Sequence, residues 1–318
     1  MQIDLAASEP HYRTHLLPIF EALPDDVRGK DWGDAMRIPP DRTLLLGGYA
    51  DVKRHALNRY VYVEHGAGQS YVGMDYGVLP FYSGGHGHNN AIGFICPNDE
   101  VASRWVKIYP DTPVAVVGCP RLDPWHSGLR GKQVEDRTVA ITFHWDAIFT
   151  GVHATASAFG HYYDCLADVI FNWRNQGWTV LGHWHPRYPA VAQFWEQLSG
   201  QFGVEVVADA DEVLDRASVL VADNTSMQAD FLSLGRPVVW LNHPTYRLDD
   251  VHGGRFWVWP TLGGQSVSSP EDLRRIDLAS LPEVTGHPYA YADGRASQRA
   301  SSAIRSWISA NQIDVSAP

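Results

Sequence analysis

The chain has 318 residues, of which 45% are hydrophobic and 19% are charged. No continuous apolar stretch reaches the roughly 18 residues of a transmembrane helix, and the apolar content excludes a disordered polymer. The formal net charge of −11 argues against broad adhesion to nucleic acid or anionic membranes, although a local basic groove is compatible with it. Three scattered cysteines match no disulfide framework, and the N-terminus lacks a basic and apolar leader, so we expect a cytoplasmic protein.

Short apolar segments alternate with helix-like segments along the first half of the chain. Strands are expected at residues 3–7, 43–46, 60–64, 93–96 and 114–117, and helices at 13–22 and 100–108. The polar stretch 123–137 then interrupts the pattern with one proline and two glycines, which predicts an interdomain linker.

The second half repeats the alternation. Strands are expected at 139–143, 179–181, 204–207, 219–222 and 238–241, with helices at 154–174, 211–216, 226–234 and finally 294–310. This pattern predicts an α/β protein with two Rossmann-like domains, residues 1–130 and 137–318, facing across a cleft, with the C-terminal helix packing back. Ligands of such sheets bind beyond the carboxyl ends of the strands, so motifs that follow a strand are the candidate sites.

Four polar residues follow the expected strand 219–222 and open the next helix: Asp223, Asn224, Thr225 and Ser226. Hydroxyl groups and backbone N–H groups at a helix start favour phosphate binding. Asp230, one turn further on, is a candidate partner for a ribose or glycerol hydroxyl. The alternative interpretation is that Asp223 or Asn224 only caps the helix.

A second motif follows the strand at 179–181 and contains His183, His185 and Arg187. Pro186 holds His185 in an extended or turn conformation, so that the imidazole and the guanidinium can neutralise a leaving phosphate. A surface or capping role is the alternative for any single histidine of this group.

A third motif places His65 in a glycine-rich turn directly after the strand 60–64. His65 is a candidate general base, which Glu64 or another carboxylate would orient. Gly66 and Gln69, in the same turn, and Arg121, near the end of the first domain, are further candidate site residues. Thr142 and His144, after the first strand of the second domain, are candidates for the phosphate site.

The run 83–90 is rich in glycine, histidine and asparagine and predicts a mobile loop. Its His86 and His88 form a His-x-His pair, a pattern that can ligate zinc. No cysteine or carboxylate lies at a supporting spacing, so no metal site is predicted.

The order of these motifs resembles the CDP-glycerol glycerophosphotransferases of teichoic-acid and capsule synthesis, which adopt the GT-B fold. The resemblance rests on His65-Gly66, a Gly-x-Pro-Arg-x-Asp element at 118–123, His185-Pro186, and the 223–226 helix start followed by Gly-Arg-Pro-Val-Val-Trp at 235–240. UDP-N-acetylglucosamine 2-epimerases share a looser form of the last element.

The resemblance implies that His65 is the acceptor-side base, that His185 stabilises the leaving phosphate, and that Thr225 and Ser226 bind the donor phosphate. Under this assignment Gly66, Gln69 and Arg121 are the acceptor-side candidates, and Thr142 and His144 are further donor-side candidates. Two positions depart from the family pattern. Glu64 stands where the family has Trp, and an acidic residue ends the His144-Trp145-Asp146 element where the family has Arg. The chain also lacks the basic membrane-binding helix expected of polymer-elongating members. These departures leave the donor and the acceptor open.

These observations predict a GT-B-like, metal-independent transferase with no tightly bound cofactor. It would move a glycerophosphate or glycosyl unit from a nucleotide-activated, CDP-glycerol-like donor to an acceptor hydroxyl. The first alternative is a UDP- or GDP-sugar glycosyltransferase that acts on a glycan, a small molecule or a modified nucleobase in DNA. The second is a non-catalytic nucleotide-binding module.

Overall fold

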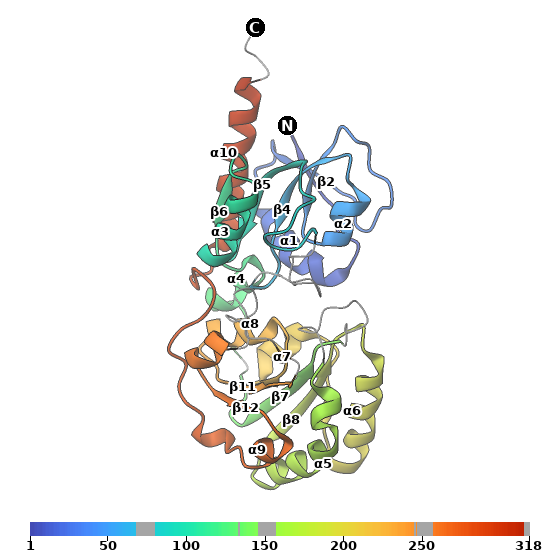
Figure 1. Ribbon diagram of the computed structural model, residues 1–318, viewed down its shortest axis with the longest axis vertical. Helices are drawn as coiled ribbons and strands as arrows, with labels where there is room; N and C mark the ends of the chain where they lie inside the picture. Colours follow the sequence, from blue (N-terminus) through green and yellow to red (C-terminus); the bar gives the residue numbers. More distant parts are fainter. Residues whose placement is uncertain (68–79, 133, 146–156, 245, 247–256, 315–318) are drawn as a thin grey trace. The chain divides into compact units, whose positions relative to one another are not determined.

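The computed structural model describes residues 1–67, 80–132, 134–145, 157–244, 246 and 257–314 (Figure 1). The chain divides into two compact units. Unit 1 comprises residues 1–71, 77–127 and 289–318, and unit 2 comprises residues 72–76 and 128–288. Each unit is built on a six-stranded parallel sheet, so the predicted α/β fold class with two Rossmann-like halves is confirmed.

Unit 1 has the strand order β2-β1-β3-β4-β5-β6. Its strands are β1 (Ile3–Leu5), β2 (Arg28–Asp31), β3 (Thr43–Leu46), β4 (Arg59–Val63), β5 (Ala91–Cys96) and β6 (Val114–Val116). Its helices are α1 (Pro10–Ala22), α2 (Tyr49–Arg54), α3 (Asp99–Ile108), the 3-10 helix η1 (Pro120–Leu122), α4 (Asp123–His126) and α10 (Ala296–Asp314).

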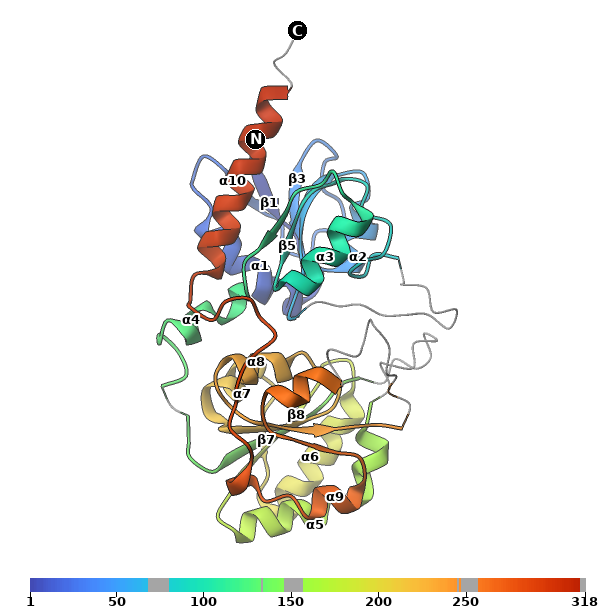
Figure 2. The same ribbon diagram turned by 60° about the vertical axis from the view of Figure 1, so that its left-hand side comes forward.

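The C-terminal helix α10 belongs to unit 1, whereas the sequence placed it in the second domain. Ile304 and Ile308 of α10 lie in the same buried cluster as Leu16 and Ile19 of α1. The ring of Trp307 covers the backbone of β5 so closely that a Cβ on Gly93 would lie 2.2 Å from it. Figure 2 shows α10, in red, alongside the unit 1 sheet.

Unit 2 has the strand order β12-β11-β10-β7-β8-β9. Its strands are β7 (Thr138–Phe143), β8 (Thr179–Trp184), β9 (Glu205–Val206), β10 (Val219–Ala222), β11 (Val238–Leu241) and β12 (Gln265–Val267). Its helices are α5 (Phe159–Asn175), α6 (Pro189–Phe202), α7 (Ala210–Arg216), α8 (Met227–Ser233), α9 (Pro270–Arg274) and the 3-10 helices η5 (Trp259–Leu262) and η6 (Leu278–Ser280).

The main core of unit 2 lies between its sheet and the helices α5 and α6. Alternate residues of β7, namely Val139, Ile141 and Phe143, point into this core because successive side chains of a strand face opposite sides. Leu166 of α5 and Trp195 of α6 pack against them, and the same periodicity turns Thr142 toward the opposite face of the sheet.

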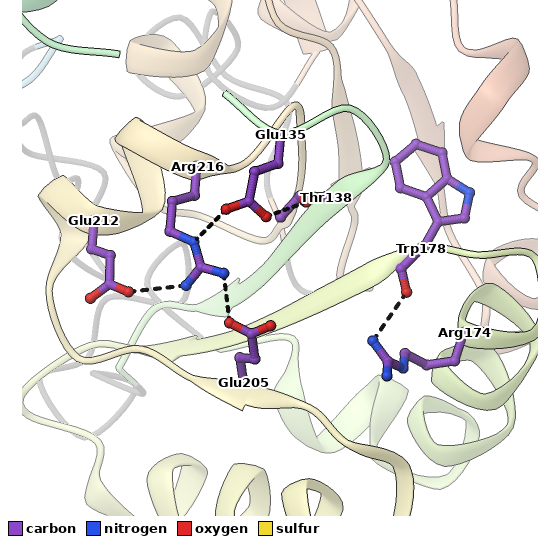
Figure 3. A network of polar contacts seen from close by, with 7 residues as sticks. All are labelled: Glu135, Thr138, Arg174, Trp178, Glu205, Glu212 and Arg216. Atoms are coloured by element: carbon purple, nitrogen blue, oxygen red, sulfur yellow. Dashed lines mark hydrogen bonds and ion pairs between the residues drawn. The ribbon is translucent and has the colours of Figure 1, made fainter. Parts of the chain in front are cut away.

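An arginine fork fastens the amino-terminal side of the unit 2 sheet (Figure 3). Arg216, the last residue of α7, contacts Glu135 at 3.2 Å, Glu205 at 2.6 Å and Glu212 at 3.1 Å. Glu135 also accepts a hydrogen bond from the Thr138 hydroxyl at the start of β7. The fork therefore ties α7 to the beginnings of β7 and β9, at the end of the sheet opposite the strand carboxyl ends.

In both sheets the strand order reverses once, because successive strands are added first on one side of the starting strand and then on its other side. In unit 2 the chain runs from β7 outward through β8 to β9 and then returns to β10 on the other side of β7. In unit 1 it runs from β1 to β2 and then returns to β3 on the other side of β1. Loops diverge from the strand carboxyl ends at such switch points, and open α/β sheets bind ligands there.

Candidate functional site

The switch point of unit 2 brings three of the sequence motifs to one edge of its sheet. His144 follows β7, the segment from Asp223 to Ser226 follows β10, and His185 follows β8, the neighbour of β7 on its other side. Their common position at the strand carboxyl ends makes this edge the candidate donor site.

Two histidines, a tryptophan and an arginine lie together beyond β7 and β8. The ring centroids of His144 and His185 are 5.2 Å apart. The ring of Trp145 lies 6.2 Å from that of His185, and the guanidinium carbon of Arg187 lies 5.3 Å from the Trp145 ring centroid. The cluster combines imidazole and guanidinium donors with an aromatic face, a combination that suits an anionic ligand with an attached ring.

Asp223 holds the loops of this edge together. Its carboxylate accepts hydrogen bonds from the His144 N–H at 2.7 Å, the Ala158 N–H at 2.8 Å and the Ser157 hydroxyl at 3.2 Å. Burial raises the pKa of Asp223 to about 7, although these three donors act in the opposite direction. Its side chain therefore joins β10 to the loop after β7 and to the start of α5. The N-cap residue of α8 is Ser226, without a side-chain capping bond, and not Asp223 or Asn224 as in the alternative interpretation.

Thr225 and Ser226 lie half-buried at the start of α8. The Thr225 hydroxyl accepts a long hydrogen bond of 3.4 Å from the Met227 N–H. The Ser226 hydroxyl has no hydrogen-bond partner within the described part of the chain, so it can bind a ligand. Asn224 and Asp230 are both buried, with 2% and 1% of their surface exposed, so a ligand would meet the two hydroxyls first.

Thr142 lies beneath this edge and does not line it. Its hydroxyl and the Nδ1 of His183 are 2.7 Å apart, and both side chains are buried. The Trp195 indole N–H donates to the His183 carbonyl at 2.9 Å. These contacts fix the ends of β7 and β8 and thereby position His144 and His185.

In unit 1, His65 follows β4 and is held by backbone. Its Nδ1 lies 3.0 Å from the Gly47 carbonyl oxygen, at the end of β3. A carbonyl only accepts hydrogen bonds, so Nδ1 carries the proton and Nε2 is the basic nitrogen of the neutral ring. The expectation that Glu64 orients His65 is wrong, because Glu64 is buried and accepts a hydrogen bond from the Trp105 indole at 2.9 Å.

The first turns of α1 add three aromatic residues around His65 that the sequence interpretation missed. The Tyr12 ring meets His65 edge-on at 4.8 Å between centroids, and the His11 and His15 rings lie 6.2 and 6.0 Å from it. Tyr12 also packs over Gly48, where a Cβ would lie 2.4 Å from its ring. The spacing of two histidines by four residues, directly after the first strand, was the available signal.

The three acceptor-side candidates, Gly66, Arg121 and Gln69, do not lie in one element of the structure. Gly66 adopts φ of 58°, a left-handed conformation that favours glycine in the turn after His65. Arg121 lies in η1, which packs against α1, and acts electrostatically on His15. Gln69 lies outside the described residues.

The segment 83–90, which the sequence predicts to be a mobile loop, contacts the rest of unit 1 through His88. The His88 ring is buried, with Nδ1 3.2 Å from the Tyr60 hydroxyl and Nε2 3.1 Å from the Phe81 carbonyl oxygen. Burial lowers the pKa of His88 to about 4. Both ring nitrogens are thus engaged within the protein, while His86 is exposed. Among the described residues there is no group of three metal-ligating side chains.

Comparisons with known proteins show the fold. No protein-family model matches this sequence, and neither does any curated protein. Among solved structures, the wall teichoic acid polymerase TagF superposes with a TM-score of 0.63 at 14% identity, covering 98% of this chain and 90% of that one. UDP-GlcNAc 2-epimerase from Neisseria meningitidis bound to UDP-GlcNAc gives a TM-score of 0.63 at 12% identity, with 96% and 100% coverage.

A putative UDP-N-acetylglucosamine 2-epimerase from Listeria monocytogenes gives a TM-score of 0.59 at 13% identity, covering 97% of this chain and 96% of that one. The chain therefore has the GT-B-like fold. At these identities the likeness concerns the fold alone. Within the described residues, no helix is long and apolar enough to cross a membrane.

Proposed function

We propose that this protein is a GT-B-type transferase that uses a nucleotide-activated donor. Unit 2 would bind the donor, and unit 1 would supply the base that activates the acceptor hydroxyl. A CDP-glycerol-like donor is the first choice because the order of the sequence motifs resembles the glycerophosphotransferases. The structural likeness to TagF and to an epimerase bound to UDP-GlcNAc supports a nucleotide-linked substrate.

The observation that carries the proposal is the convergence of His144, His185 and Arg187 with the Thr225–Ser226 hydroxyls at the switch point of unit 2. Imidazolium and guanidinium groups form strong hydrogen bonds with phosphate oxygens, and the hydroxyls add neutral donors. Trp145 offers a ring on which a base or ribose can pack. This set can neutralise a nucleotide phosphate with side chains of the chain itself.

The proposed reaction moves one group and one proton. The acceptor oxygen forms a bond to the donor phosphorus, or to the anomeric carbon of a sugar donor, while the bond to the nucleotide breaks. The acceptor proton passes to Nε2 of His65, and the bonding electron pair leaves on the nucleotide phosphate oxygen. His185 and Arg187 stabilise the charge on that oxygen, which is electrostatic catalysis of the kind that dominates many transfer reactions.

A thermal-shift panel with CDP, UDP, GDP and CMP, with and without magnesium, tests the donor site. A nucleotide at 100 times its Kd stabilises the folded state by about 2.7 kcal/mol, enough for a shift of several degrees. We expect CDP to give the largest shift, independently of magnesium, and the shift to shrink in a Thr225→Ala/Ser226→Ala variant.

Ser302→Ala is the matched control, because Ser302 is an exposed hydroxyl on α10 that donates to the Gln298 carbonyl. It should keep the full nucleotide response. A larger shift with UDP or GDP would replace the CDP-glycerol-like donor by a nucleotide sugar. The donor-site assignment fails if no nucleotide stabilises the wild-type protein, or if the double variant responds as the wild type does.

A further inference from the structure

Unit 1 contains a buried polar atom that its own chain does not satisfy. His15 is only 7% exposed, and its Nδ1 has no hydrogen-bond partner within the described residues. Leaving a buried polar atom unpaired costs about 1–3 kcal/mol, so such atoms usually have a bound partner. No step of the proposed reaction uses His15, and its orphan nitrogen therefore needs its own explanation.

The surroundings of His15 are aromatic and cationic. Helical side chains lean toward the helix N-terminus, so His15 leans toward His11, one turn earlier. Both rings lie about 6 Å from the His65 ring, at 6.0 and 6.2 Å between centroids. The three imidazoles therefore form one cluster at the switch point of unit 1, where the Gly47 carbonyl holds His65.

Arg121 adds positive charge to this cluster. The groups that act electrostatically on His15 are Arg121, His65 and His11, and each is a cation or can become one. Burial is the main cause, and these charges a smaller one, of a pKa of His15 well below its ordinary value. His15 therefore remains neutral, with one ring nitrogen that can donate a hydrogen bond. The carboxylate of Glu9 lies 3.5 Å from His11 and is an opposing charge beside this cluster.

We propose that His15 and Arg121 form an oxyanion subsite beside His65, which binds a phosphate or carboxylate group of the acceptor. Arg121 provides the charge, and His15 provides a directional N–H at Nδ1. That the bound anion belongs to an acceptor rests on the proposed function, whereas the anion site itself does not. The acceptor class that follows is a small hydroxylated molecule whose reacting hydroxyl lies close to an anionic group.

Imidazole NMR of the full chain labelled with 15N-histidine tests the subsite directly. Inorganic phosphate and acetate serve as separate probes and distinguish the two oxyanion classes. We expect the His15 and His65 nitrogen signals to shift in a saturable manner with at least one probe. The His15 signal is identified by its absence from His15→Phe.

Variants of His15 and Arg121 distinguish an effect on anion binding from an effect on the stability of the fold. His15→Phe fills a similar volume without a polar atom and should weaken binding of the probe about tenfold or more while leaving the melting temperature unchanged or higher. His15→Asn keeps a polar atom near the position of Nδ1 and should retain part of the affinity. Arg121→Gln should weaken binding even if His15→Phe does not fold. His86→Ala, an exposed histidine of the same unit, is the control.

The experiment needs no nucleotide and no turnover, so it does not depend on the donor assignment. If the wild-type protein binds no nucleotide but its His15 signal still responds to anions, the proposed function is refuted and the subsite stands. Absence of any anion-dependent shift at His15 and His65, or equal affinity in wild type, His15→Phe and Arg121→Gln, would overturn the subsite.

Discussion

The carboxyl edges of the two sheets are built from similar residue types and expose them to different degrees. In unit 1, His15 and His65 are buried, with 7% and 6% of their surfaces exposed, and the Tyr12 ring packs against His65. In unit 2, His144 and His185 are half-buried, and Arg187 is exposed beside them. One edge surrounds His15 and His65 with protein, and the other presents imidazole, guanidinium and hydroxyl groups outward.

This difference predicts different chemistry at the two edges. Burial disfavours the charged form of an imidazole. The ring therefore stays neutral and can accept a proton from a reacting hydroxyl. A partly exposed group of imidazoles, a guanidinium and hydroxyls is suited to hold a charged phosphate. The proposed division, with the base in unit 1 and the donor phosphate in unit 2, follows from burial as much as from residue identity.

The largest expected effect concerns the base of unit 1. Replacing His65 by Ala should lower the rate of transfer by about 10²–10⁴-fold, because proton abstraction from the acceptor is lost. Nucleotide affinity should not change, since His65 belongs to unit 1. Steady-state rates together with nucleotide titration measure both quantities, with His86→Ala as the control. A His65→Ala variant of unaltered rate would remove the base from the account.

The pH dependence of stability should differ in sign between two buried groups, Asp223 of unit 2 and His88 of unit 1. The folded-state pKa of Asp223, about 7, lies above the ordinary value for aspartate, so the unfolded chain releases its proton first as pH rises. Stability from this group therefore falls between about pH 4 and 7, by up to about 4 kcal/mol. Denaturant unfolding of wild type and Asp223→Asn across this range gives the difference. A difference that grows with pH would contradict the assignment.

His88 of unit 1 should show the opposite slope and a somewhat smaller effect. Its folded-state pKa of about 4 lies below the ordinary histidine value of about 6.5, so the unfolded chain takes up the proton first on acidification. Stability from neutral His88 is complete above about pH 6.5 and is lost toward pH 4, by about 3 kcal/mol. His88→Gln, which does not titrate, provides the reference. Parallel pH profiles of wild type and variant would show that His88 is not buried as a neutral group.

The smallest effect is expected at the arginine fork of unit 2, away from the donor edge. Arg216→Ala removes three carboxylate contacts, but all three carboxylates are nearly half exposed, with 46–49% of their side-chain surface accessible. Exposed pairs contribute about 0.2–1 kcal/mol each, and the loss should diminish at high salt. Nucleotide binding should be unaffected. Chemical denaturation at low and high ionic strength measures the effect, and a loss above about 3 kcal/mol would mean that the fork acts as a buried network.

Strong local patterns made most of the fold predictable. Buried strands such as β7 and β10 read as continuous apolar runs, and their polar successors at 144 and 223–226 identified the donor edge. The four-residue strand β2 has the sequence RGKD and carries no apolar pattern, so it was not expected. Helix α6 was missed although Val191, Phe194, Trp195 and Leu198 recur at helical spacing.

Long-range contacts account for what the sequence did not predict. One partner of Asp223 is a backbone N–H 65 residues away, and one partner of Glu64 is an indole 41 residues away. The placement of α10 on unit 1 depends on apolar contacts with α1, from the opposite end of the chain. Only tertiary packing brings such groups together, and no local pattern encodes the choice of partner.

The most direct test of the division between the two edges is isothermal titration of one nucleotide into three proteins. Wild type, His185→Ala and His65→Ala would each be titrated with the nucleotide that gives the largest thermal shift. The account predicts about tenfold weaker binding for His185→Ala, which loses a phosphate contact, and unchanged binding for His65→Ala. Equal losses in both variants, or a loss confined to His65→Ala, would contradict it.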